Sequence, residues 1–207
     1  MAQVAERKQI PVGDGAYIKP WTRDELYRLL DLGVIDPEEP RIELIAGEIF
    51  QKMPMKSPHA VSVELVGDAL RGVFRGLAAV RTEKPLVLAT DGEPEPDAVV
   101  VRGTTRTYEK AHPTQDDTLL VVEISDSTLR FDRGRKGSYY AEAGITDYWI
   151  VNINERQVEI YRNPHSDPQN EWGFAYDAPQ IFKDGDTVTA LAAPLAPILV
   201  TDLLPAP

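Results

Sequence analysis

Two acids and a lysine stand beside apolar segments in the middle of the chain. Pro96-Asp97 leads into the apolar run 98–101, and a second apolar run, 119–122, is followed directly by Glu123. Lys136 comes next, in a basic segment. Strands this apolar carry a charge only where it has a partner or a chemical task. Two such acids with a nearby lysine are the groups needed to hold a divalent metal ion and to activate water.

The chemistry of these groups is that of a magnesium site. If the two runs pair in a sheet, both carboxylates can reach one ion, and Mg2+ (or Mn2+) takes such hard oxygen ligands. The backbone carbonyl of Ile124 would add a ligand at the same edge. A bound ion lowers the pKa of its water and stabilises charge on a phosphate. Lys136 would position that water and stabilise the hydroxide it becomes.

The same residues also allow a purely structural interpretation. Asp97 would then be a strand-end acid that caps the next loop, and Glu123 would form an ion pair with Arg130 or Arg133. Lys136 lies four residues after Asp132, so a solvated helix pair accounts for it without any chemistry. Each residue alone is more often structural. The two acids and the lysine together favour a functional site about as strongly as they favour a structural role.

Other candidate groups carry weaker signals. Glu43 lies between Ile42 and Leu44 on a short predicted strand, where it would either reach the same cleft or face water by alternation. His59 begins a helix, and a lone histidine there is more often packed or solvated than a ligand. The chain has no glycine-rich phosphate loop and no G-x-S-x-G turn, so neither a nucleotide cradle nor a serine triad is expected.

The overall charge argues against a general nucleic-acid binder. The chain of 207 residues has a net charge of −11, whereas such binders are usually basic. The balance reverses locally, and we expect a basic group to steer substrate phosphates, namely Arg130, Arg133 and Arg135. Cysteine is absent, which excludes disulfides, thiolate zinc sites and cysteine nucleophiles.

Hydrophobic patterning predicts an arm over residues 1–20 and one domain over 21–207. No apolar stretch approaches the roughly 20 residues of a membrane span, and the N-terminus does not resemble a signal peptide. We therefore expect a cytoplasmic protein that does not enter the membrane.

The expected elements alternate between helices and strands. Thr22 and Glu25 form a capping box ahead of a helix, and Ser57-Pro58 opens a second helix. A third helix is expected over 131–143, closed by Gly144. Short strands are expected at 79–81, 86–88, 98–101 and 119–124, and further short strands beyond Pro164. A strand pair turned at Ala46-Gly47 is expected over 41–50, and a second pair joins 148–151 with 158–161. This order predicts an α/β fold with a mixed central sheet flanked by helices and extra C-terminal strands.

Six segments of the chain form a specific combination, namely RIELIAGEI at 41–49, EPEPD at 93–97, VVEIS at 121–125, LRFDRGRK at 129–136, YYAEAGI at 139–145 and YWIVN at 148–152. Together they resemble the Uma-two family of putative restriction endonucleases, a branch of the PD-(D/E)xK nuclease superfamily. The similarity runs from about Trp21 to the C-terminus.

This resemblance implies a restriction-endonuclease-like core with a metal ion held by Asp97 and Glu123. The superfamily pattern places the catalytic lysine two residues after the glutamate, where this chain has Ser125. In the Uma-two family the lysine lies on the next helix, which matches Lys136. Glu43 occupies the family's upstream acidic position and would be an accessory ligand or orienting residue.

The resulting interpretation is a Mg2+- or Mn2+-dependent endonuclease that hydrolyses phosphodiester bonds of nucleic acid, with DNA as the expected substrate. A nuclease fold used only for binding is one alternative. A metal-dependent hydrolase of small phosphates or nucleotides is another, and the acidic charge suits it better. The C-terminal strands with Trp172, Phe174 and Tyr176 would form either a homodimer surface or part of the core.

Overall fold

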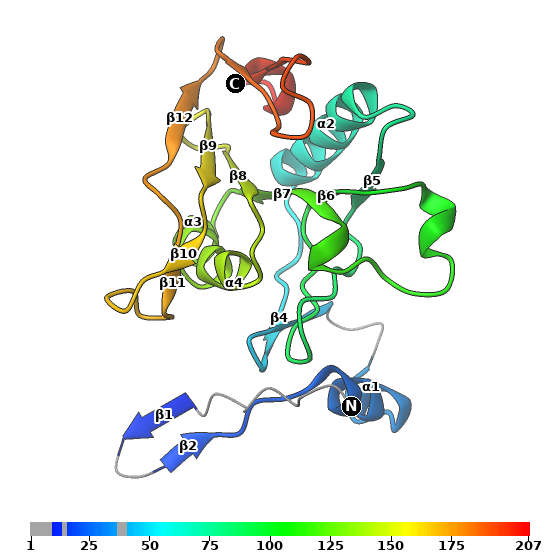
Figure 1. The fold of residues 1–207 in the computed structure, drawn as a ribbon, viewed down its shortest axis with the longest axis vertical. Helices are drawn as coiled ribbons and strands as arrows, with labels where there is room; N and C mark the ends of the chain where they lie inside the picture. The colour runs from blue at the N-terminus through cyan, green and yellow to red at the C-terminus, as the bar shows by residue number, and fades with distance from the viewer. Residues whose placement is uncertain (1–9, 14–15, 37–40) are drawn as a thin grey trace. The chain divides into compact units, whose positions relative to one another are not determined.

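The computed structural model describes residues 10–13, 16–36 and 41–207 (Figure 1). The chain divides into two compact units, one of Met1–Met53 with Leu88–Pro94 and one of Pro54–Val87 with Glu95–Pro207. Residues 1–9 and 14–15 of the expected arm lie outside the described residues, and the boundary between arm and domain stays a prediction. None of the helices formed by the described residues has the length and apolarity needed to cross a bilayer.

The first unit confirms two local predictions. Its elements are β1 (Ile10–Gly13), β2 (Ala16–Ile18), α1 (Arg23–Asp31), β3 (Ile42–Ile45) and β4 (Glu48–Gln51). Ahead of α1, the Thr22 hydroxyl accepts a hydrogen bond from the Glu25 amide at 3.3 Å, and the Glu25 carboxylate accepts one from the Thr22 amide at 3.0 Å. Between β3 and β4, Ala46 and Gly47 both have positive φ, which is the geometry of a tight hairpin turn.

The second unit is built on a six-stranded sheet with the order β12-β9-β8-β7-β6-β5. Its strands are β5 (Ala79–Thr82), β6 (Ala98–Val101), β7 (Thr118–Ser125), β8 (Asp147–Asn152), β9 (Gln157–Arg162) and β12 (Gln180–Lys183). Strands β7 and β8 run parallel, and the other neighbouring strands run antiparallel. The mixed central sheet predicted from the sequence is therefore confirmed.

Helices and short elements complete this unit. They are α2 (Ser57–Val73), α3 (Leu129–Phe131), a π-helical turn (Asp132–Lys136), α4 (Gly137–Glu142), three 3-10 turns (Thr105–Tyr108, Gln115–Asp117, Val200–Leu203) and strands β10 (His165–Ser166), β11 (Phe174–Ala175), β13 (Thr187–Val188) and β14 (Ile198–Leu199). The strand expected at 86–88 is wrong: Val87 and Leu88 form only isolated bridges. Pro85, which precedes them, has no amide hydrogen to donate to a ladder.

One face of the sheet is apolar and forms the core. Side chains of Val100, Val122, Trp149 and Ile160 pack there with apolar residues of α2 and of the C-terminal 3-10 turn. Figure 1 shows that turn, in red, beside α2. The buried Ser62 hydroxyl of α2 donates to a backbone carbonyl of the turn, and this bond fixes the helix to the C-terminal segment.

The opposite face of the same sheet is also buried, but it carries acidic side chains among apolar ones such as Val99 and Val121, and we call it the polar face. Strand register pairs Ala98 with Val122, so Asp97 comes opposite Glu123 one position further along. Because side chains alternate along a strand, the two carboxylates share a face, and Glu159 of β9 lies on it as well. The segment formed by α3, the π turn and α4 covers this face through contacts to Glu123 and Glu159. The fold thus separates an apolar face from a face that carries buried charged side chains.

The aromatic residues 172, 174 and 176 lie next to the covering segment. A Cβ atom at Gly134 would come within 2.9 Å of the Trp172 ring, and the Tyr176 hydroxyl donates to the Ile145 carbonyl at 2.8 Å. These two aromatic side chains therefore pack within their own unit, and a homodimer stays a prediction.

The apolar face predicts where stability resides. We expect Leu70→Ala, in the fully buried part of α2, to lower the free energy of unfolding by about 2–5 kcal/mol because it leaves a cavity. Leu77→Ala removes the same atoms from a side chain that is 71% exposed, and it should change the free energy of unfolding by less than about 0.5 kcal/mol. Urea unfolding of both variants measures the difference, and equal losses would contradict this placement of the core.

Candidate functional site

Asp97 is held at the start of β6 by contacts to both carboxylate oxygens. Its Oδ2 accepts a hydrogen bond from the Ile124 amide at 2.7 Å, which ties it to the neighbouring strand β7. Its Oδ1 lies 3.3 Å from Nε2 of His59, in the first turn of α2. The Asp97 side chain is almost fully buried, so its charge is oriented by the protein and not by bulk water.

Glu123 is held by residues of the covering helix, the segment formed by α3, the π turn and α4. Its Oε1 accepts hydrogen bonds from Lys136 Nζ at 2.9 Å and from the Tyr140 hydroxyl at 2.6 Å. Glu123 and Lys136 are both nearly inaccessible to solvent. A buried pair of this kind is kept when each charge has its partner and further hydrogen bonds, which is the arrangement seen here.

A π-helical turn delivers Lys136 to the sheet. In the turn the Gly137 amide bonds to the Asp132 carbonyl, five residues back, so the helix is locally widened. Asp132 and Lys136 are buried, whereas Arg133 between them is exposed. Residue 137 is glycine, and a Cβ there would come within 3.1 Å of the Asp132 carbonyl oxygen. The helix predicted over 131–143 is confirmed, with this distortion in the turn that carries Lys136.

Asp132 is a third buried acid near the site, and its pKa is raised to about 6. Burial is the main cause, and the negative charge of Asp97 raises the pKa further. The Lys136 ammonium and the Thr128 hydroxyl, which donates to Asp132 Oδ2 at 2.5 Å, act in the opposite direction. From the sequence, Asp132 was expected only as a solvated helix partner of Lys136, because it lies in a charged segment that is typical of an exposed surface.

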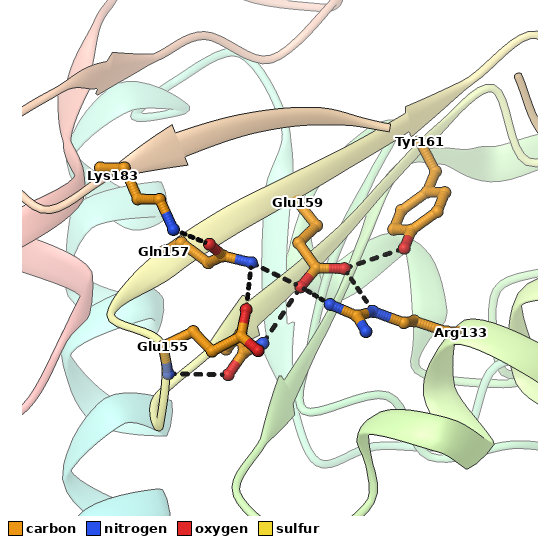
Figure 2. A network of polar contacts seen from close by, with 7 residues as sticks. Arg133, Glu155, Gln157, Glu159, Tyr161 and Lys183 are labelled. Atoms are coloured by element: carbon orange, nitrogen blue, oxygen red, sulfur yellow. Dashed lines mark hydrogen bonds and ion pairs between the residues drawn. The ribbon is translucent and has the colours of Figure 1, made fainter. Parts of the chain in front are cut away.

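The arginine expected to bind phosphate at position 133 is engaged with the protein. Figure 2 shows its guanidinium against Glu159, with Nε and NH2 donating to the two carboxylate oxygens at 2.8 and 2.6 Å. Glu159 also accepts from Gln157 and Tyr161, so this buried carboxylate lies at the centre of a network. Burial alone would raise the Glu159 pKa, but these hydrogen bonds, Arg133 foremost, lower it to about 2. The network ties β9 to the covering helix.

The other predicted residues fall in different places. Arg130 is exposed at the start of the covering helix and Arg135 is half-buried in the π turn. Glu43 belongs to the first unit, where it is buried on β3 with its carboxylate 3.4 Å from Lys52 Nζ. Roles for these residues in phosphate binding or as an accessory ligand stay predictions.

Two contacts at the carboxylates were missed by sequence reasoning. Tyr140 lies four residues after Lys136, so both side chains meet Glu123 from one side of the helix, and that spacing was a usable signal. His59 reaches Asp97 from α2, and no local pattern indicates this because 38 residues separate them.

The donor set fits a small divalent cation. Asp97 and Glu123 are opposed carboxylates whose remaining contacts orient them, and oriented ligands are what a metal site requires. Within the described ranges, no group of three or more acidic or histidine side chains is arranged to hold an ion. Magnesium is commonly bound by one or two carboxylates with water and phosphate completing its shell, so two suffice.

Comparisons with known proteins point to nucleases. The sequence model of the Uma2 family, described as "Putative restriction endonuclease", matches residues 23–196. Four chains of solved structures match, among them the crystal structure of a putative nuclease belonging to DUF820 from Anabaena variabilis ATCC 29413. That match has 20% sequence identity and a TM-score of 0.63, and it covers 89% of this chain and 97% of the other. The likeness shows a shared fold. No curated protein matches the sequence.

The raised pKa of Asp132 predicts a pH-dependent stability. Between about pH 4 and 6 the unfolded chain loses this proton while the folded protein keeps it, so the stability that Asp132 contributes is lost as the pH rises. The shift corresponds to about 3 kcal/mol. In chelator, urea unfolding should show wild type losing about this much relative to Asp132→Asn between pH 4 and 7. A difference that does not change with pH would rule out the raised pKa.

Proposed function

Because this chain belongs to the Uma2 family of putative restriction endonucleases, we propose that it is a metal-dependent endonuclease that hydrolyses phosphodiester bonds in nucleic acid. The observation that supports this most is the register that sets Asp97 opposite Glu123 on the polar face, with Lys136 2.9 Å from the glutamate. We expect DNA as the substrate, and a symmetric dimer would suit the cutting of both strands.

Asp97 and Glu123 would hold Mg2+ or Mn2+, with the Ile124 carbonyl as a further ligand. A divalent ion bound there would lower the pKa of a water molecule and stabilise the charge that develops on the phosphate. The Ile124 amide orients the Asp97 carboxylate, and Lys136 and Tyr140 together orient Glu123. These donors reduce the reorganisation needed when the substrate arrives.

Lys136 is the group best suited to act on the attacking water. Its ammonium is buried and fixed by Glu123, so it donates from a defined position in a site that contains little bulk water. An ammonium there stabilises a hydroxide and the added negative charge of the pentacovalent phosphorus more strongly than it would in solvent. The exposed Arg130 would attract the phosphate backbone from outside, with an effect that salt weakens.

Loss of the Asp97 charge tests the metal site. In Asp97→Asn the side-chain oxygen still accepts from the Ile124 amide, so the fold should persist while cleavage falls more than about a hundredfold. Outer groups that only orient ligands already change affinity or activity by about 10–100-fold. The measurements are plasmid nicking and calorimetric titration of Mg2+ and Mn2+. Asp202→Asn, an exposed acid in the same unit, is the matched control. Nicking by Asp97→Asn at the wild-type rate would refute the assignment.

The variant Lys136→Met distinguishes the role of the lysine in cleavage from the role of the metal ligands. It removes the ammonium but no metal ligand, so we expect cleavage to be lost while calorimetry still detects metal binding. Metal would then neutralise Glu123 in place of the ammonium and offset part of the stability lost when a buried pair is broken, about 3–5 kcal/mol. Wild-type cleavage by this variant would mean that the lysine is only a structural partner.

The two rival functions give different results in the same assays. A binding module with a nuclease fold would bind nucleic acid with no dependence on metal or on Asp97, and it would never nick. A hydrolase of small phosphates would turn over nucleotides, leave plasmid intact and show little dependence on salt, because few backbone phosphates are involved.

A further inference from the structure

Arg81 of β5 lies on the polar face of the sheet, beside the carboxylates. The register pairs Arg81 with Val99, two residues along β6 from Asp97, so Arg81 and Asp97 are diagonal neighbours. Diagonal neighbours in a sheet are about 7–8 Å apart at the backbone. The residues on either side of Arg81 face the other way: Val80 packs against the apolar core, and Thr82 accepts a hydrogen bond from an arginine of α2. Arg81 therefore projects on the side that carries Asp97.

The Arg81 guanidinium has polar and aromatic neighbours but no acid. One terminal nitrogen lies 3.3 Å from Nδ1 of His112, and the Tyr108 ring centroid is 5.7 Å from Cζ. Its Nε is buried and makes no hydrogen bond. Among the described residues no carboxylate lies within ion-pair distance of Arg81, in contrast to Arg133, which Glu159 neutralises.

An arginine in this position lacks the usual compensation for burial. Partly buried cations normally have a carboxylate or another anion beside them. Desolvation lowers the pKa of Arg81, which is the sign of a charge that has lost water without gaining an opposite charge. A phosphate group would satisfy it, because the planar guanidinium fork matches two phosphate oxygens.

The connection between β6 and β7 positions Tyr108, the aromatic neighbour of the Arg81 guanidinium. The Tyr108 hydroxyl donates to the Arg102 carbonyl at 2.6 Å, and the Arg102 amide bonds to the Asp117 carbonyl at 2.8 Å. The connection therefore keeps Tyr108 in place. It also carries the cations Arg102, Arg106 and Lys110 and the acids Glu109, Asp116 and Asp117, so its formal charges balance. Attraction of a phosphate therefore rests on Arg81 and not on the connection.

We propose that Arg81, with Tyr108 and His112 around it, binds a backbone phosphate of the nucleic acid next to the phosphate that is cleaved. The proposal rests on the proposed nuclease function. Arg81 pairs with Val99, two residues along β6 from Asp97, so it reaches a neighbouring phosphate of a polynucleotide. It binds and positions the strand, whereas Lys136 acts at the scissile phosphate.

The test is the salt dependence of binding to a fluorescent oligonucleotide duplex, measured by anisotropy in chelator with wild type, Arg81→Met and Arg75→Met. Arg75 is an exposed arginine after α2, on the apolar side of the sheet, so its loss changes net charge by the same amount. We expect Arg81→Met to weaken binding about tenfold and to reduce the slope of log K against log salt by about 1. Arg75→Met should weaken binding less than about twofold.

Cleavage kinetics show whether Arg81 binds the scissile phosphate or a neighbouring one. With metal present, Arg81→Met should raise KM for the duplex while leaving hydrolysis of bis(p-nitrophenyl) phosphate, which has a single diester, unchanged. Equal losses on both substrates would place Arg81 at the scissile phosphate and overturn the proposal. The proposal would also be overturned if Arg81→Met bound the duplex as tightly as Arg75→Met does. Melting temperatures of all variants should match wild type, and Arg81→Lys provides a second variant that keeps charge but loses the fork.

The two hypotheses fail separately. If wild type does not cleave but its binding depends on Arg81, the phosphate subsite stands and the nuclease function is wrong. If wild type cleaves and binding does not depend on Arg81, the nuclease function stands and the subsite is wrong.

Discussion

The pairing of β6 with β7 is the constraint on which the site depends. One antiparallel register places Asp97 opposite Glu123, and the Ile124 amide then bonds to Asp97 across the strands. A shift by one residue would turn one of the two carboxylates toward the apolar core, where it could not be neutralised. The strand pairing that buries these apolar runs therefore also sets the two acids side by side.

Burying acids on a sheet requires cations, and the covering helix supplies them. Lys136 pairs with Glu123 on β7, and Arg133, three residues earlier, pairs with Glu159 on β9. The two ion pairs join one short helical segment to two strands that lie on either side of β8. Both cations come from the π turn. Lys136 is buried there, and Arg133 is partly exposed. Electrostatics and helix geometry together set where the ammonium lies.

Much of the framework could be predicted because it depends on local pattern. Apolar runs predicted β6 and β7, a capping box predicted α1, and the Ala46-Gly47 pair predicted a hairpin. The bidentate pairing of Arg133 with Glu159 joins residues 26 apart and depends on which strand neighbours which, so single-sequence reasoning could not find it. The significance of Arg81 was hidden for the same reason: an arginine without an acid partner is recognisable only once all its neighbours are known.

The separation of the sheet into a dry face and a polar face has a consequence for how such a protein can diverge. The largest hydrophobic cluster lies on the apolar side, where α2 and the C-terminal turn pack. When both partners of a buried ion pair are replaced together by apolar residues of similar size, stability is often unchanged. A lineage that exchanged Glu123 and Lys136 jointly would lose the proposed chemistry while its architecture survived, and natural selection could then give the same scaffold another task.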